Sequence, residues 1–360
     1  MSKSILFVCA DYGGGIAKML RYVMGICVDI FDDITLVHRG RESASDIIPI
    51  GVSEIVLPSS VGKTMPVWRF NHIRSIRQII KEKKPDIVCA FGSEIAVMTS
   101  MSMIGIKGPK LLLAERGDPY TLPLKWKILL RLSYLKANNG VFQLKAQGEW
   151  FGCSVMKRSR VIPNAYIPTG AIPSYSGARK KEIVSVGRFV PEKRYEILIK
   201  SFAEVHKIHP EYSLCIYGDG PSRAIYEDLI NEYGLESCVR LPGYTNNSME
   251  SIKDASVFVL SSLYEGMPNT LIEALVCGVP TVSTNCTPGG PSFLTDNGRR
   301  GLLVPVDDVK AMSGAICSII ENPQLAEDLS AQGVEVAEEL NDSKIKLLWK
   351  EYFQYILANR

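Results

Sequence analysis

Residues 255–275 read ASVFVLSSLYEGMPNTLIEAL, a succession of apolar residues, a turn and an amphipathic segment. The apolar run has the length of a buried strand, Gly266 and Pro268 mark a turn, and Asn269 or Thr270 is suited to cap a helix. A buried strand followed directly by a helix is typical of a parallel sheet that helices cover on both faces. The stretch therefore predicts an α/β fold.

The same alternation continues along the whole chain. In the first half, strands are expected at 4–10, 33–38, 54–57, 86–90, 110–114 and 140–143, with helices at 15–31 and 69–83. In the second half, strands are expected at 182–187, 213–218, 239–241, 256–261, 280–283 and 301–304, with a helix at 195–206. The pattern in each half thus predicts a separate doubly wound parallel-sheet domain.

The segment from Val161 to Lys181 is rich in Pro, Ser, Gly and basic residues, which favours a linker. We predict an N-terminal domain at 1–168 and a C-terminal domain at 169–343. A last helix, about 344–360, carries Leu347, Leu348, Tyr352, Tyr355 and Ile356 and is expected to pack back on the first domain.

Composition excludes several classes of protein. The chain has 360 residues and 46% hydrophobic content, enough for two domains of ordinary size. Its apolar runs are strand-sized, so we expect no membrane-spanning helix and a cytoplasmic location. Nine cysteines without a Cys-x-x-Cys indicate reduced thiols, and four histidines without a ligand motif predict no metal site.

Charge is distributed unevenly between the halves. Lys and Arg minus Asp and Glu gives 23 − 13 = +10 for residues 1–168 and 18 − 25 = −7 for residues 169–360. A basic half favours an anionic partner such as a membrane surface, a phosphorylated lipid or a nucleic acid, and a solvated basic surface is the alternative. Residues 124–136 mix cations, aromatic and apolar residues at helical spacing, as helices at membrane interfaces do, while a core helix with cationic edges would show the same pattern.

Two carboxylates flank the turn in the opening stretch. Glu265 precedes the expected helix and Glu273 lies inside it. A helix start offers N–H groups to phosphate oxygens, and ionised acids accept hydrogen bonds from hydroxyl groups. This pair suits a ligand with phosphates and several hydroxyls, such as a nucleotide sugar. In the alternative, Thr270 and Glu273 form an ordinary capping box and Glu265 is a solvated loop acid.

Further polar and glycine-rich turns follow other predicted strands, where ligands of doubly wound sheets bind. Arg188 and Lys193 flank the turn after the strand at 182–187, and two cations there suit a diphosphate without a metal. The glycines at 13–15 follow the first strand, but they do not continue as Gly-x-Gly-x-x-Gly, which disfavours a dehydrogenase.

Four motifs of this chain together resemble the donor domain of family four retaining glycosyltransferases. They are Gly187-Arg188 with Lys193, Tyr217-Gly218-Asp219-Gly220, Pro242-Gly243-Tyr244, and Glu265-Gly266-x-Pro268 with Glu273-Ala274. The resemblance implies the GT-B architecture, which has two Rossmann-like domains, an active site in an interdomain cleft and no required metal. It further implies catalytic roles for Glu265, Arg188 and Lys193. The implied donor-binding residues are Gly14, Gly15, Gly187, Gly218, Gly243, Tyr244, Gly266, Met267, Pro268, Asn269, Thr270 and Glu273.

Within this set, the resemblance implies that Arg188 and Lys193 bind the donor diphosphate, Glu265 the sugar hydroxyls and Glu273 the ribose. In the first domain, the segment 114–119 resembles a bacterial branch that builds capsule and O-antigen chains, which implies that Glu115, Arg116 and Asp118 lie on the acceptor side. The chain departs from the family in two places. It lacks a histidine between His72 and His206, and it has Ser292 and Phe293 where many members place an acid.

The predicted function is transfer of a hexosyl or N-acetylhexosaminyl unit from a nucleoside diphosphate sugar, a uridine one, to a lipid-linked or polysaccharide acceptor with retention. The partners implied are the nucleotide sugar, a glycan or polyprenyl-diphosphate-linked acceptor and the anionic inner face of the plasma membrane, with no cofactor and no nucleic acid. Two alternatives stay open: a sugar-nucleotide epimerase on the same scaffold, and a noncatalytic nucleotide-sugar-binding protein.

Overall fold

The computed structural model describes residues 2–12, 14–41, 47–58, 64–167 and 179–359. It divides into two compact units: Met1–Ala165 with Asp342–Arg360, and Tyr166–Asn341. The boundary predicted from the sequence, between residues 168 and 169, lies outside the described residues.

The first unit is a parallel sheet between two layers of helices. Its described strands pair in the order β5-β3-β1-β6-β7-β8-β9. They are β1 (Ser4–Cys9), β3 (Asp33–His38), β5 (Val52–Val56), β6 (Ile87–Phe91), β7 (Lys110–Ala114), β8 (Asn139–Phe142) and β9 (Ser159–Val161). Asp11–Tyr12 and Gly40–Arg41 (β2 and β4) form a separate short pair. The order reverses between β1 and β6, where a doubly wound sheet offers a ligand site at its carboxyl edge.

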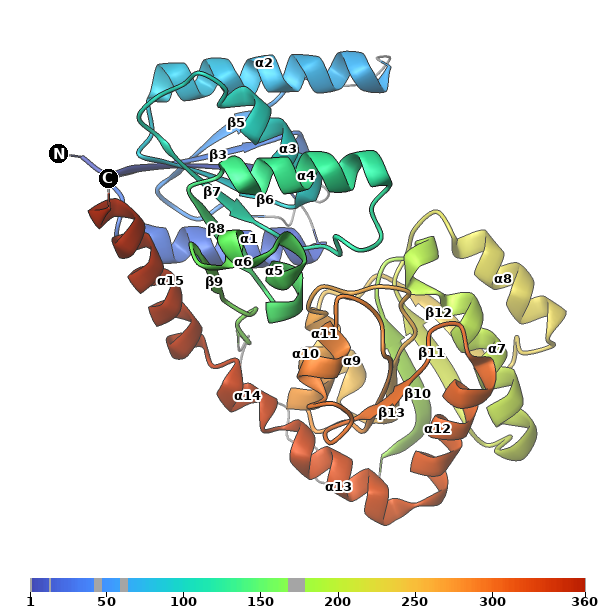
Figure 1. Ribbon diagram of the computed structural model, residues 1–360. Helices are drawn as coiled ribbons and strands as arrows, with labels where there is room; N and C mark the ends of the chain where they lie inside the picture. The colour runs from blue at the N-terminus through green and yellow to red at the C-terminus, as the bar shows by residue number, and fades with distance from the viewer. Residues whose placement is uncertain (1, 13, 42–46, 59–63, 168–178, 360) are drawn as a thin grey trace. The chain divides into compact units, whose positions relative to one another are not determined.

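Helices cover both faces of this sheet (Figure 1). On one face lie α2 (Met65–Lys83), α3 (Ser93–Ser102) and α4 (Leu124–Lys136), and on the other α1 (Gly14–Cys27) packs against α15 (Asp342–Ala358). The short helices α5 (Lys145–Phe151) and α6 (Cys153–Met156) lie beside β8 and β9. All-apolar strand segments such as that of β6 are buried on both sides, which explains their continuous hydrophobic runs.

The second unit repeats the plan. Its described strands pair in the order β12-β11-β10-β13-β14-β15, so the order reverses between β10 and β13. They are β10 (Lys180–Val186), β11 (Ser213–Tyr217), β12 (Val239–Gly243), β13 (Ala255–Leu260), β14 (Thr281–Thr284) and β15 (Leu302–Val304). All the pairs are parallel. The predicted pair of doubly wound parallel-sheet domains is confirmed.

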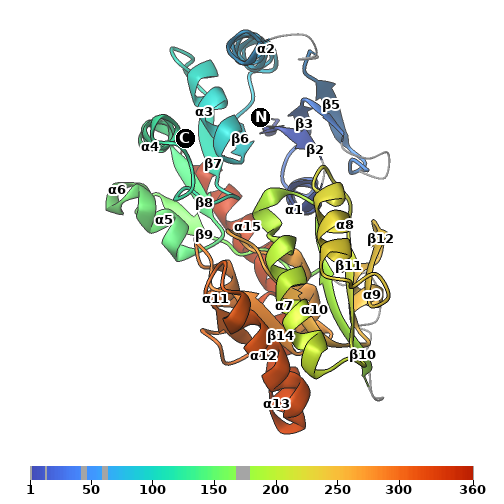
Figure 2. The ribbon, with the colours of Figure 1, turned by 90° about the vertical axis from the view of Figure 1, so that its right-hand side faces the viewer.

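Helices of the second unit also form two layers. In Figure 2, α7 (Tyr195–Ile208), α8 (Arg223–Glu232) and α12 (Val309–Glu321) cover the nearer face of the sheet. The other face is covered by α9 (Ser248–Ile252) and α10 (Asn269–Val276), and α10 also contacts α11 (Gly290–Leu294), α13 (Pro323–Gly333) and α14 (Val336–Glu339). The core on the first face includes Leu198, Phe202 and Val205 from α7.

The C-terminal helix α15 returns to the first unit. It buries Ile345, Trp349, Tyr352, Phe353 and Ile356. The predicted apolar face is therefore wrong in part, because Leu347, Leu348 and Tyr355 are 56%, 41% and 47% exposed. Apolar residues occur on more than one side of this helix, and the aromatic contacts of Trp349 with Phe91 and of Phe353 with Phe31 decide which side is buried.

Candidate functional site

The predicted donor residues of the second unit follow the strands that flank its topological switch point. Gly187 and Arg188 follow β10, and Glu265 lies in the turn between β13 and α10. The backbone N–H of Leu263 donates to the Glu192 carbonyl at 2.8 Å, which ties the two turns together. Because β10 and β13 are neighbouring parallel strands, their side chains meet at one carboxyl edge.

Lys193 and Glu265 are in direct contact at this edge. Lys193 Nζ lies 2.5 Å from Glu265 Oε1, and the two side chains are 20% and 13% exposed. Ser262 Oγ donates to the same carboxylate oxygen at 2.7 Å, and Ser261 Oγ donates to the Lys193 carbonyl at 2.7 Å. An ammonium group has three N–H donors, so Lys193 can hold Glu265 and still bind a phosphate oxygen.

Glycines let several backbone segments approach one another beneath this pair. A Cβ on Gly187 would lie 2.6 Å from the Tyr195 hydroxyl, and one on Gly218 would lie 1.8 Å from the Gly187 carbonyl oxygen. Gly218 also donates its N–H to the Gly243 carbonyl at 2.8 Å. The ends of β10, β11 and β12 are thus packed at distances that only glycine permits at Gly187 and Gly218.

Tyr195 lies fully buried below the Gly187 turn. Burial raises the pKa of the Tyr195 phenol well above its ordinary value, and the Glu265 carboxylate raises it further. The hydroxyl therefore stays protonated at physiological pH, and its position fixes the path of the turn that carries Arg188, whose side chain is exposed.

The residue that caps the helix after Glu265 is not one of the two that were expected. Helix α10 begins at Asn269 with Pro268 as its N-cap residue, so neither Asn269 nor Thr270 caps it. The capping-box alternative is wrong, because proline offers no side-chain oxygen and Thr270 already lies inside the helix. The first N–H groups of any α-helix have no acceptor within the helix itself, so this helix start remains suited to an anion.

Glu273 is held from a different helix. The residue is 6% exposed, and its carboxylate accepts a hydrogen bond from Ser248 Oγ of α9 at 2.5 Å. Tyr244, between β12 and α9, is 77% exposed, and Met267 is buried.

Sequence reasoning missed Ser248, Ser261 and Ser262. The two serines directly after β13 carried a signal, since they precede Glu265 at the strand end, whereas Ser248 carried none.

Gly266 lies against a second glycine loop. A Cβ on Gly290, the first residue of α11, would lie 1.9 Å from the Gly266 carbonyl oxygen. The N–H of Glu265 donates to the Thr287 carbonyl at 2.9 Å. The glycine-rich turn at 287–291 therefore supports the turn that carries Glu265.

Replacing Ser248 with alanine is a direct test of the role expected for Glu273. Loss of one hydrogen bond to a charged group costs about 1.5–3 kcal/mol, so we expect the donor KM to rise by roughly ten- to hundredfold while kcat changes little. Steady-state kinetics with varied donor measures this. Ser251→Ala, on the same helix but bonded to Thr245 and Asn247, is the matched control and should keep the wild-type KM. Equal KM values for both variants would contradict the role of Ser248.

The predicted acceptor-side residues occupy the loop after β7 in the first unit. Glu115 is fully buried, and its Oε1 accepts from Ser93 Oγ at 2.8 Å and from the N–H groups of Arg116 and Gly117 at 3.0 and 2.9 Å. Burial raises the pKa of the Glu115 carboxyl. The side chain thus fixes the shape of the loop. Asp118 is also buried, and its Oδ1 accepts from the Tyr120 N–H at 2.8 Å.

Arg116 is packed inside the same unit. Its guanidinium lies 4.9 Å from the Phe91 ring centroid and 5.6 Å from that of Trp349, and Nη1 donates to Asn164 Oδ1 at 3.4 Å. Burial lowers the pKa of Arg116 to about 10. Gln143 Nε2 donates to the same Asn164 oxygen at 2.7 Å. This network ties the end of β8 and the loop after β7 to the segment that leaves the first unit.

Gly14 and Gly15, predicted to bind the donor, are the first residues of α1, and Gly13 lies outside the described residues. They belong to the first unit, as do Glu115, Arg116 and Asp118, whereas the other predicted site residues belong to the second.

Known proteins are similar to this chain in sequence and in fold. The family model described as "Glycosyl transferases group 1" matches residues 174–336. Residues 174–336, within the second unit, therefore form a group 1 glycosyltransferase domain. A Methanocaldococcus jannaschii protein named as an uncharacterized glycosyltransferase is 26% identical over 357 residues, covering 84% of this chain and 88% of its own.

Two further proteins extend the comparison. The Campylobacter jejuni GalNAc-alpha-(1->4)-GalNAc-alpha-(1->3)-diNAcBac-PP-undecaprenol alpha-1,4-N-acetyl-D-galactosaminyltransferase is 25% identical over 283 residues and covers 78% of both chains. The crystal structure of Anabaena HepE in complex with UDP-glucose superposes with a TM-score of 0.81 at 18% identity, covering 98% of this chain and 99% of its own. At that identity the likeness shows the fold.

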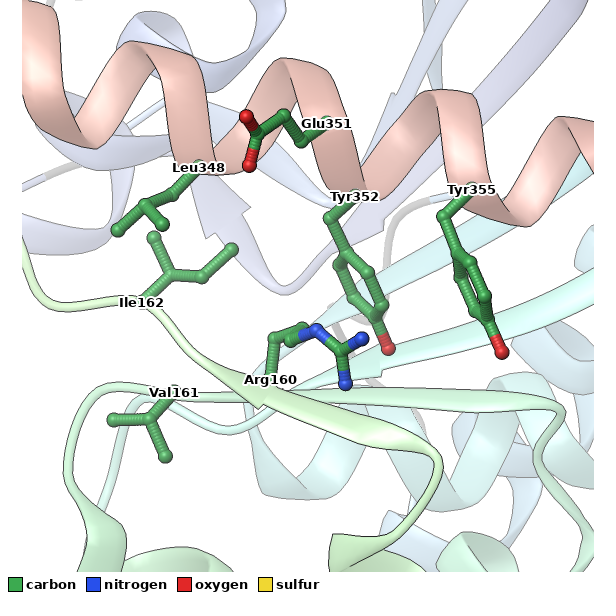
Figure 3. Close-up of a pocket in the computed structure, with 7 residues that line it drawn as sticks. All are labelled: Arg160, Val161, Ile162, Leu348, Glu351, Tyr352 and Tyr355. Carbon is green, nitrogen blue, oxygen red and sulfur yellow. The ribbon is translucent and has the colours of Figure 1, made fainter.

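The first unit has a cavity of about 230 Å³ between β9 and α15 (Figure 3). It is lined by Arg160, Val161, Ile162, Leu348, Glu351, Tyr352 and Tyr355. The Arg160 guanidinium lies 5.7 and 5.6 Å from the rings of Tyr352 and Tyr355, and Tyr352 donates its hydroxyl hydrogen toward the carbonyls of Gly140 and Arg158, both at 3.0 Å. These contacts hold α15 against the edge strand, and none of the predicted site residues lines the cavity.

Among the described residues, one group has side chains that are compatible with a metal ion. The ligand atoms of His209, Cys317 and Glu321 lie within 4.8 Å of one another, and His209 Nε2 lies 3.0 Å from Glu321 Oε1. His209 follows α7 and precedes β11, which places it at the amino edge of the sheet, away from Glu265. The expectation of a reaction without a metal stays a prediction.

Proposed function

We propose that the chain transfers a hexosyl or N-acetylhexosaminyl unit from a UDP-sugar to a hydroxyl group of a lipid-linked or polysaccharide acceptor in cell-surface glycan synthesis, with retention at the anomeric carbon. The contact between Lys193 and Glu265 beside the start of α10 carries the proposal. It unites a cation, a carboxylate and helix N–H groups, which the diphosphate and the sugar hydroxyls of such a donor require.

Most of the free-energy barrier of the proposed transfer comes from the departure of the diphosphate leaving group. Negative charge grows on its oxygens as the bond to the sugar breaks, and Lys193, Arg188 and the α10 N–H groups would stabilise it in place. Glu265 would orient the sugar hydroxyls and Glu273 the ribose. Because two cations and a helix start balance the diphosphate charge, the proposed reaction needs no metal, and turnover is expected to persist in EDTA.

Two relatives support the donor and acceptor classes. HepE binds UDP-glucose, and the Campylobacter jejuni enzyme is named for an undecaprenol-diphosphate-linked acceptor. The donor base, the retained configuration and the acceptor class are our proposal for this chain.

A peripheral position at the inner face of the plasma membrane is proposed from α4. Leu124, Ile128, Leu129, Leu132 and Leu135 are between 40% and 74% exposed on a helix that also carries four Lys or Arg residues. Exposed apolar side chains among cations are typical of helices that lie on anionic membranes. Of the helices that the structure describes, none is both long and apolar enough to cross a membrane.

Incubation with a panel of UDP-sugars and an undecaprenyl-diphosphate-linked glycan tests the function. We expect one donor to be consumed, with UDP and an extended glycan formed, and nuclear magnetic resonance of the new linkage to show the anomeric configuration of the donor. A new free sugar nucleotide without acceptor would indicate the epimerase instead. Binding of UDP-sugar without transfer or hydrolysis would indicate the noncatalytic protein.

A further inference from the structure

The helices α7 and α12 of the second unit pack side by side (Figure 2). Both start at the carboxyl edge of the sheet, because each follows a parallel strand, β10 or β15. Beside their starts, Arg194 Nη2 lies 2.9 Å from Asp307 Oδ2. At their ends, His209 Nε2 lies 3.0 Å from Glu321 Oε1. The two helices therefore run in the same direction, and polar contacts connect them at both ends.

A third side chain joins His209 and Glu321 where the two helices end. Cys317 and Glu321 are four residues apart on α12, so they lie on the same face of the helix, one turn apart. The ligand atoms of His209, Cys317 and Glu321 all lie within 4.8 Å of one another. Cys317 is a free cysteine. A contact between the imidazole and the carboxylate accounts for two members of this group but not for the thiol.

The imidazole of His209 is held in position by its neighbours. The His209 backbone N–H donates to the Val205 carbonyl at 2.8 Å, and the His209 carbonyl accepts from the Tyr212 N–H at 3.1 Å. Its ring meets the Tyr212 ring edge-on, with 6.0 Å between the centroids. The His209 side chain is 16% exposed, whereas that of Glu321 is 55% exposed. The group therefore combines a fixed nitrogen ligand with a carboxylate that has room to move.

The three ligand types indicate which metal the group suits. Zinc binds thiolate, imidazole and carboxylate ligands, whereas Mg²⁺ and Ca²⁺ take oxygen ligands. At zinc bond lengths of about 2.0–2.3 Å, tetrahedral ligand atoms lie about 3.4–3.6 Å apart, so a closure on the order of 1 Å reaches that spacing. In addition, α7 ends directly before His209 and α12 ends at Glu321. The partial negative charge at two helix C-termini favours a cation there.

We propose that His209, Cys317 and Glu321 bind a zinc ion that links the end of α7 to the end of α12, with water as the fourth ligand. The proposal replaces the prediction of no metal site, which relied on ligand motifs within short stretches of sequence. Here His209 and Glu321 are 112 residues apart in the chain. The ion lies at the amino edge of the sheet, away from Glu265, so it stabilises the second unit and takes no part in the proposed transfer.

Titration of the full-length, chelator-treated protein with Co²⁺ tests the site, because a cobalt–thiolate bond gives an absorption band in the near ultraviolet. We expect the wild type to show this band and Zn²⁺ to abolish it by displacing the cobalt. Cys317→Ser should lose the band. Cys153→Ser, which changes an exposed cysteine of the first unit, is the matched control and should keep it. Absence of the band in the wild type, or its retention by a folded Cys317→Ser protein, would overturn the proposal.

His209→Gln and Glu321→Gln decide the question if Cys317→Ser fails to fold. Loss of a residue that merely supports a metal ligand costs about tenfold or more in metal affinity, so loss of a ligand should raise the Kd for Zn²⁺ at least tenfold. Competition with a fluorescent chelator measures this Kd. Glu204→Gln, an exposed glutamate of α7 that pairs with Lys207, should keep the wild-type value. Wild-type Kd values in both ligand variants would contradict the assignment.

Scanning calorimetry with and without Zn²⁺ tests whether the ion links the two helices. A metal that binds the folded state and not the unfolded chain raises the melting temperature. We expect Zn²⁺ to raise the transition of the second unit in the wild type, EDTA to reverse the rise, and the transition of the first unit to stay in place. His209→Gln should show no rise. An equal rise in His209→Gln, or none in the wild type, would reject a zinc link between α7 and α12.

Discussion

Lys193→Ala is expected to lower turnover by roughly two to three orders of magnitude at saturating donor. A preorganised group that stabilises charge in the transition state contributes about 2.7–4 kcal/mol, and Lys193 is held in place by Glu265 at 2.5 Å. Rates of UDP release with the identified acceptor measure the change. Lys181→Ala, an exposed lysine at the start of β10 that pairs with Glu211, is the matched control and should keep wild-type turnover.

Lys193→Ala removes a cation from the diphosphate site and also releases the Glu265 carboxylate from its ion pair, so two causes contribute to the loss of turnover. A double-mutant cycle with Glu265→Gln separates the two. If Lys193 acts on the diphosphate, the double variant should be slower than Glu265→Gln alone by a further large factor. If Lys193 only positions Glu265, the double variant and Glu265→Gln should have the same rate. Full turnover of Lys193→Ala at saturating donor would contradict the assignment.

Trp349→Ala is expected to destabilise the first unit by about 3–5 kcal/mol, the usual cost of emptying a buried tryptophan site. The side chain is fully buried, stacks on Phe353 at 5.4 Å between ring centroids and on Phe91 at 6.4 Å, and lies 5.6 Å from the Arg116 guanidinium. For a unit of this size, such a loss lowers the melting temperature by on the order of 10 °C.

Scanning calorimetry is the measurement, with Leu347→Ala on the exposed side of α15 as the control. The transition of the first unit should move in Trp349→Ala and stay in place in Leu347→Ala, while that of the second unit stays in place in both. An unchanged first-unit transition in Trp349→Ala would show that α15 does not contribute to the stability of the first unit.

The strands were largely predictable because they are buried on both faces. The runs at 33–38 and 110–114, DITLVH and KLLLA, have buried apolar centres and polar first residues, and β3 and β7 have these same bounds. The edge strand β9 was missed, since Ser159–Val161 is only three residues long and its middle residue, Arg160, is exposed. A short edge strand that carries a charge leaves no hydrophobic period to detect.

The orientation of α15 shows where sequence patterns stop being decisive. Leu347 and Leu348 are as apolar as the buried Ile345, and helical spacing alone permits either side to dock. Packing against Phe91 and Phe31 selects the side with Trp349 and Phe353. The outcome depends on partners far away in the sequence.

In the candidate site, too, some residues were predictable from the sequence and others were not. Lys193 and Glu265 are predictable from their place after two strands, because parallel strands bring their ends to one edge. Ser248 holds Glu273 from a separate short helix, and no local pattern links the two residues. The burial of Glu115 was likewise unpredictable, since an acid in a loop after a strand is ordinarily solvated.

The proposed function requires Arg188, Lys193, Glu265 and Glu273 to form the site of a nucleoside diphosphate sugar. Thermal-shift measurement of the wild type and Lys193→Ala against a panel of UDP-sugars tests it most directly, since a bound donor stabilises the fold by an amount set by its concentration over its Kd. We predict that at least one UDP-sugar raises the melting temperature of the wild type, and that Lys193→Ala loses most of this shift. An equal shift in both proteins would show that Lys193 does not bind the donor, and no shift with any nucleotide sugar would show that these residues do not form a donor site.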